Sequence, residues 1–144
     1  MRYLMAATFL ALLFAAPPAV AGEKPQATLY KNPQCDCCEG HAAYLRQHGY
    51  TVTVKPTHDL TSINRQFGVP EKLEGCHTTV IGGYVVEGHV PIKTFDRLIT
   101  ERPNIRGISL PGMPAGSPGM TGRKTGRFTI YEISNGPDKV YAVE

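Results

Sequence analysis

Three of the four cysteines lie within four residues, and this crowding restricts the fold and chemistry of the chain more than any other feature. They are Cys35, Cys37 and Cys38, between a strand-like run at 27–31 and a helix-like run at 39–48. The unpaired amides and the dipole at a helix N-terminus favour negative charge, so a thiolate forms more readily there. Thiolate is both the nucleophile of disulfide exchange and a ligand for soft metal ions.

The first 21 residues have the pattern of a signal peptide. Arg2 precedes an apolar run at 4–16, and Ala19–Ala21 is a small-x-small cleavage site. We therefore expect residues 1–21 to be removed and residues 22–144 to form one domain, exported most simply to a bacterial periplasm. No later segment is apolar enough to cross a bilayer, so we expect no membrane span in the mature chain.

Charge and cysteine number restrict the partners. The chain has 15 Lys and Arg against 12 Asp and Glu, and these bases are scattered, which argues against nucleic acid as a partner.

Four cysteines in an exported protein permit two structural disulfides. However, adjacent Cys37 and Cys38 cannot easily pair, and short disulfide loops stabilise little. A metal or redox site explains the crowding better, with a disulfide-stapled binding module as an alternative.

The hydrophobic pattern predicts a thioredoxin-like α/β fold in the order βαβαββα. Strands are expected at 27–31, 51–55, 78–81 and 84–87, and helices from 37 or 38 to 48, from 59 to 67 and from 91 to 101. The Pro/Gly-rich segment 107–122 is expected to form neither helix nor strand. The runs 128–133 and 139–143 should then form a β-hairpin that extends the sheet or packs beside it.

This topology predicts that all four cysteines meet at one edge of the sheet. The cluster at 35–38 follows the carboxyl end of the first strand. Cys76 and His77 precede the third strand, which should run antiparallel to the first. The amino end of the third strand then lies beside the cluster, so Cys76 should face the other three sulfur atoms.

The histidines have different expected roles. His41 lies three and four residues after the last two cysteines of the cluster, so it shares their helix face and is a candidate ligand. Adjacent strand residues point to opposite faces, so we expect one of Cys76 and His77 to point away. His89 either lines the rim or hydrogen-bonds the backbone at the start of the third helix.

Two chemistries compete for these sulfur atoms. Cys35 and Cys38 have the C-x-x-C spacing of a thiol-disulfide oxidoreductase, but Cys37 could attack mixed disulfides and scramble the outcome. Zinc would accept four thiolates. Met113 and Met120, the only methionines outside the leader, both lie in the Pro/Gly segment. Thiolate and thioether together select Cu(I), so we expect these methionines to bind copper, with packing under the loop as the alternative.

Three motifs together resemble one known family. They are Tyr30-Lys31-Asn32-Pro33 with Cys35-x-Cys37-Cys38, the run from Gly75-Cys76-His77 to Gly88-His89-Val90-Pro91, and Leu110-Pro111-Gly112-Met113-Pro114 with Gly116-Ser117-Pro118-Gly119-Met120. Over residues 27–134 the chain is similar to the exported copper-resistance protein CopG and its relatives, long classed as a domain of unknown function. Many of these relatives carry a bulky aromatic residue, often Trp, where this chain has His41.

The resemblance implies a thioredoxin-like fold, a periplasmic location and a cluster of several thiolate-bridged copper ions. On this reading Cys35, Cys37, Cys38 and Cys76 supply the thiolates, Met113 and Met120 close the site, and His41 is the next candidate. The resemblance also implies cycling between Cu(I) and Cu(II), and whether this amounts to enzymatic turnover is left open. The expected partners are copper ions and other periplasmic copper-handling or electron-transfer proteins.

Overall fold

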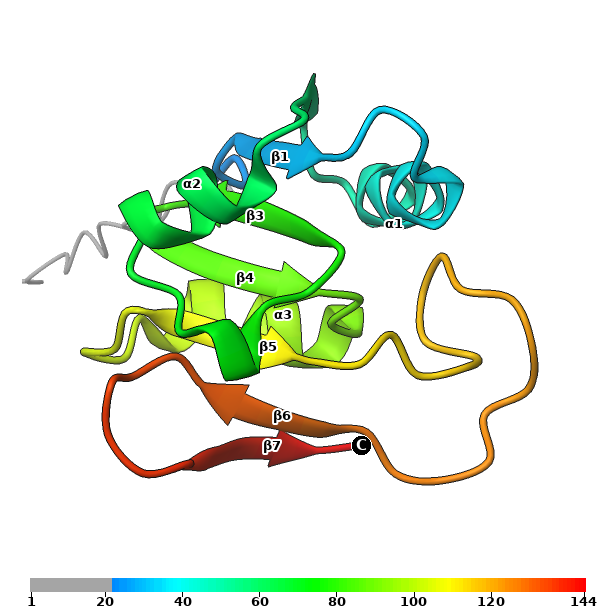
Figure 1. Cartoon of the computed structure of the whole chain (residues 1–144). Coiled ribbons are helices and arrows are strands. Elements are labelled where there is room, and N and C mark those ends of the chain that lie inside the picture. The colour runs from blue at the N-terminus through cyan, green and yellow to red at the C-terminus, as the bar shows by residue number, and fades with distance from the viewer. Residues whose placement is uncertain (1–21) are drawn as a thin grey trace, which may run out of the picture.

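The computed structural model describes residues 22–144, so the expected leader at 1–21 lies outside the described residues. Seven strands form one sheet in the order β2-β1-β3-β4-β5-β6-β7 (Figure 1). The elements are β1 (Ala27–Lys31), α1 (Asp36–Gln47), β2 (Val52–Pro56), α2 (Leu60–Gln66), η1 (Glu71–Leu73), β3 (His77–Ile81), β4 (Tyr84–Gly88), α3 (Ile92–Glu101), β5 (Gly107–Leu110), β6 (Thr129–Glu132) and β7 (Val140–Val143).

The first part of the sheet confirms the predicted thioredoxin-like topology. β1 and β2 are parallel and are joined through α1, whereas β3 runs antiparallel to β1 and pairs with β4 in a hairpin. Gly82 and Gly83 form the hairpin turn with φ angles of 56° and 89°. Positive φ at both central residues gives the tight turn that matches the twist of the flanking strands.

The prediction that segment 107–122 contains no strand is wrong at its start. Gly107–Leu110 forms β5, which pairs parallel with β4 and antiparallel with β6. All four residues of β5 are buried. Only glycine fits at 107, because a Cβ there would lie 1.8 Å from the carbonyl oxygen of Val85. β5 connects the C-terminal hairpin of β6 and β7 to the sheet, so the expected hairpin does extend the sheet.

Apolar side chains pack on both faces of the sheet. Leu45 of α1 and Phe95 of α3 belong to the larger buried cluster, together with Val86 of β4. Val85, the preceding residue, belongs to a second cluster with Leu73 of η1. Successive strand residues point to opposite faces, so the two clusters lie on opposite sides of β4. The packing of Leu45 in the larger cluster therefore anchors α1 beside the end of β1.

We expected the first helix to begin at residue 37 or 38, and α1 begins one residue earlier than this range, at Asp36. Cys35 is its N-cap, and Cys37 and Cys38 lie inside its first turn. Among the described residues, no helix is long and apolar enough to span a membrane.

Candidate metal centre

The fold brings all four cysteines to one end of the sheet. Lys31, the last residue of β1, is paired with His77, the first residue of β3. The turn after β1 leads directly into α1, and Cys76 immediately precedes β3. The sulfur atoms of the four cysteines consequently lie within 4.8 Å of one another. These sulfur atoms therefore meet at a single edge, as expected from the topology.

Two of these sulfur atoms are joined to each other. Cys35 and Cys38 form a disulfide, with 5.4 Å between their Cα atoms, while Cys37 and Cys76 are free. The sulfur of Cys37 lies 3.3 Å from that of Cys35. Four thiolates are therefore available only after this disulfide has been reduced.

Cys76 is also in contact with two imidazole rings. Its sulfur lies 3.3 Å from Nδ1 of His77 and 3.0 Å from Nε2 of His89. Our expectation that one of Cys76 and His77 points away is wrong. Alternation applies within a strand, and Cys76 lies just before the first residue of β3, so its backbone does not follow the pleat. Cys76, His77 and His89 form a second group whose ligand atoms lie within 4.8 Å of one another.

His41 lies behind His77 rather than among the sulfur atoms. Its Nδ1 is 2.8 Å from Nε2 of His77, and its Nε2 is 3.1 Å from the carbonyl oxygen of Val90. Both ring nitrogens thus have partners, and His41 is in neither group of converging ligand atoms. Its expected role as a direct ligand stays a prediction, because in this conformation its two ring nitrogens are paired with His77 and with the Val90 carbonyl.

Burial sets the protonation of these groups. It lowers the pKa of His41 to about 4 and holds the pKa of His77 well below its ordinary value. Burial also lowers the pKa of His89. The three rings are therefore neutral at pH 7, the form that binds metal. Burial, followed by the neighbouring Cys37, raises the pKa of Cys76 to about 12, so an incoming metal ion must displace its thiol proton.

The Pro/Gly-rich loop between β5 and β6 packs on the helix that carries the cysteines (Figure 1). Gly119 has a φ of 84°, and a Cβ there would lie 2.4 Å from the amide nitrogen of His41. The carbonyl oxygen of Pro118 accepts a hydrogen bond of 2.7 Å from Nδ1 of His89. Met120 follows this contact and is partly buried, whereas Met113 is 44% exposed. The loop therefore covers the histidine side of the site.

Comparison with solved structures identifies the family. Two structures of a copper resistance protein CopG, described as form 2 and form 1, match this chain with TM-scores of 0.77 and 0.76. Each is 33% identical to this chain and covers 85% of it, and the matches span 99% and 98% of the CopG chains. The chain belongs to the CopG family. The resemblance noted in the sequence is thereby confirmed.

A family model described as a protein of unknown function, DUF411, matches residues 73–120. This part of the CopG-family chain contains Cys76, both histidines that contact it, and the loop with Met113 and Met120. A search of the curated proteins gives no match to the sequence.

Sequence reasoning missed Lys31, which organises the cysteine turn. Only 3% of its side chain is exposed, and its Nζ donates hydrogen bonds of 3.2–3.3 Å to the carbonyl oxygens of Asn32, Pro33 and Cys35. Nζ also lies 3.3 Å from a carboxylate oxygen of Glu39. A buried lysine beside this turn therefore holds the three carbonyl oxygens of the turn together. The clue in the sequence was a lysine ending an otherwise buried strand.

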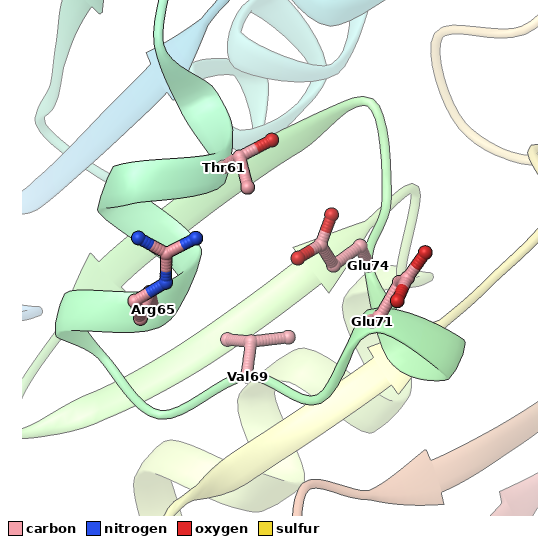
Figure 2. Close-up of a pocket in the computed structure, with 5 residues that line it drawn as sticks. All are labelled: Thr61, Arg65, Val69, Glu71 and Glu74. Carbon is pink, nitrogen blue, oxygen red and sulfur yellow. The ribbon is translucent and has the colours of Figure 1, made fainter.

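One described pocket lies elsewhere, between α2 and η1, where Thr61, Arg65, Val69, Glu71 and Glu74 line it (Figure 2). No cysteine or histidine is among these residues. The sulfur and nitrogen ligands are therefore not part of the lining of this pocket.

Proposed function

We propose that this protein is exported to the periplasm and binds copper there as part of copper resistance. The observation that carries the proposal is the convergence of four cysteine sulfur atoms within 4.8 Å at one edge of the sheet. Thiolates are the ligands that favour Cu(I) over harder ions. The names of the related solved structures, copper resistance protein CopG, support this choice of metal.

In the finer form of the proposal, Cys35, Cys37, Cys38 and Cys76 bridge more than one copper ion. The donor set fits this use once the Cys35–Cys38 disulfide is reduced, because sulfur atoms this close can share ions between them. Met113 and Met120 close the site from the loop. Mixed sulfur and nitrogen donors serve both oxidation states, so cycling between Cu(I) and Cu(II) with periplasmic electron-transfer or copper-handling partners belongs to the same proposal.

Copper stoichiometry in the reduced protein tests this function. We expect the reduced chain to take up more than one Cu(I), and Cys37→Ser to lower that number, because it removes a sulfur near the other three. Gln34→Ser is the matched control, since Gln34 is an exposed residue of the same turn. Metal analysis after removal of unbound copper gives the ratio. Equal copper content in the wild type and Cys37→Ser would exclude a shared four-sulfur site.

A second candidate function is thiol-disulfide exchange, favoured by the disulfide at the N-terminus of α1 in a thioredoxin-like fold. Cys35 is partly exposed and Cys38 is buried, so Cys35 would attack and Cys38 would resolve the mixed disulfide. If Cys35→Ser abolishes reduction of insulin disulfides while Cys37→Ser leaves copper uptake unchanged, exchange is the function. If the wild-type protein does not reduce insulin disulfides, this second candidate function is excluded.

A further inference from the structure

The three buried histidines and Cys76 form a hydrogen-bonded chain that is anchored at both ends by backbone. His41 bonds the carbonyl oxygen of Val90, and His89 bonds that of Pro118. Between these anchors, His41 contacts His77, and both His77 and His89 contact the sulfur of Cys76. The anchors determine which ring nitrogens carry hydrogen.

Each neutral imidazole has one N–H group, and a carbonyl oxygen can only accept. His89 therefore carries its hydrogen on Nδ1, and His41 carries its hydrogen on Nε2. Nδ1 of His41 is then an acceptor and must receive the Nε2 hydrogen of His77. It follows that Nδ1 of His77 and Nε2 of His89 both present lone pairs to the sulfur of Cys76.

The single thiol hydrogen of Cys76 cannot satisfy both lone pairs, so the three converging ligand atoms offer more acceptors than donors. We propose that Cys76, His77 and His89 form a distinct site for one Cu(I) ion, which is filled even while the Cys35–Cys38 disulfide is present. A thiolate with two imidazoles is a donor set that copper accepts. The choice of copper rests on the proposed function, whereas the existence of the site rests on the convergence of the three ligand atoms within 4.8 Å of one another.

The geometry suits a metal ion after a small expansion. With the bond lengths of a tetrahedral zinc site, about 2.0 Å to nitrogen and 2.3 Å to sulfur, two donors lie about 3.5 Å apart, and we use this spacing as a guide for copper. The observed separations from sulfur to nitrogen are 3.3 and 3.0 Å, and the His77 and His89 rings are nearly perpendicular at 89°. Opening the cluster by a few tenths of an ångström would admit the ion. Cys37 lies near enough to become a fourth ligand.

Each nitrogen ligand also has the outer partner that metal-binding histidines require. Such a histidine usually donates its second N–H to a fixed acceptor, which sets the tautomer and orientation of the ring. His41 is that acceptor for His77, and the Pro118 carbonyl is that acceptor for His89. His41 is thus a positioning residue, and the loop is part of the site. The disulfide removes Cys35 and Cys38 from the ligands but leaves these three untouched.

The test uses the full chain with Cys35→Ser and Cys38→Ser combined, which eliminates the disulfide pair permanently. Titration with Cu(I) against a coloured Cu(I) chelator should show one tightly bound ion per chain. Adding His89→Gln should weaken its binding at least about tenfold, whereas His48→Gln, at an exposed histidine that bonds its own helix, should not. Unchanged affinity in folded His89→Gln protein, or no bound ion in the double variant, overturns the proposal.

X-ray absorption of the double variant loaded with one copper needs no histidine substitution, so it avoids variants that fail to fold. We expect both nitrogen and sulfur neighbours around copper, and an all-sulfur shell overturns the site. The proposed function can be excluded by a different result from the one that excludes this site. If the reduced wild type binds no more copper than the double variant, the shared four-sulfur site is excluded while the Cys76–His77–His89 site stands.

Discussion

Glu87 is a buried carboxyl group beside the backbone that leads to Cys76. Its Oε2 accepts a hydrogen bond of 2.9 Å from the amide of Gly75, and its Oε1 has no hydrogen-bond partner among residues 22–144. Burial raises the pKa of Glu87 from 4.5 to about 8. The folded protein therefore holds this proton more tightly than the unfolded chain, so stability falls as pH rises between about 4.5 and 8.

Glu87→Gln removes this titration while keeping an acceptor for the Gly75 amide. We expect the variant to gain stability relative to the metal-free wild type by a few kcal/mol on going from pH 5 to pH 8. Urea unfolding at both pH values measures the difference, and Glu71→Gln, at an exposed position, is the control. The buried histidines, whose pKa values are lowered, act in the opposite direction in both proteins and cancel in the comparison. Parallel pH profiles for the variant and the wild type would refute the assignment.

At single residues, the sequence predicted which sulfur atoms meet but not which histidines join them. The positions of the cysteines follow from the order of the strands. The direction of Cys76 relative to His77 depends on whether β3 begins at residue 76 or 77, and the hydrophobic pattern does not determine an element boundary to one residue. His89 contacts Cys76 at the rim, which was one of its two expected roles, but the carbonyl oxygen that it hydrogen-bonds belongs to Pro118 of the loop and not to the start of α3.

The contact between the Pro/Gly-rich loop and α1 depends on a glycine. Gly119→Ala places a methyl group 2.4 Å from the amide nitrogen of His41, so the loop must move away from the helix. Gly112→Ala is a matched control, since Gly112 also has a positive φ, of 80°, but its Cβ would meet nothing within 4 Å. Both variants carry the cost of a side chain at positive φ, on the order of 1 kcal/mol.

We expect only Gly119→Ala to speed trypsin cleavage at Arg123 and Lys124 and to weaken copper retention several-fold. Both effects follow from displacement of the loop that orients His89. Limited proteolysis and chelator competition measure them. If the two variants behave alike, the effect belongs to backbone strain and not to the loop contact.

Among the elements, β5 shows why short buried strands are hard to predict. Ile108 and Leu110 alternate with Gly107 and Ser109, which is the pattern of a strand. Because prolines and glycines follow directly, the sequence pattern predicted a loop for the whole segment. All four residues are buried because β5 lies between β4 and β6, and this neighbourhood is set by tertiary packing. The hydroxyl of Ser109 is satisfied by donating to the carbonyl oxygen of Leu73.

For the whole molecule, the position of the disulfide indicates that the core, and not the sulfur atoms, holds the domain together. Cys35 and Cys38 are three residues apart, so their bond closes a very small loop. In the loop-entropy model, such a bond stabilises the fold by about 2 kcal/mol, near the low end for disulfides. The main apolar cluster draws on both α1 and α3 and on strands across the sheet, independently of this bond.

We therefore expect the reduced, metal-free protein to remain folded at 25 °C, with a melting temperature lower by no more than about 10 °C. Cu(I) at 100 times its dissociation constant should then add about 2.7 kcal/mol, because the metal binds only where the fold brings α1 and β3 together. Calorimetry of oxidised, reduced and copper-loaded protein gives the three values, with the Cys35→Ser, Cys38→Ser double variant as a control that cannot re-form the Cys35–Cys38 disulfide. Unfolding on reduction alone would instead identify a domain held by its disulfide, and the crowded cysteines would then serve the fold before they serve a metal.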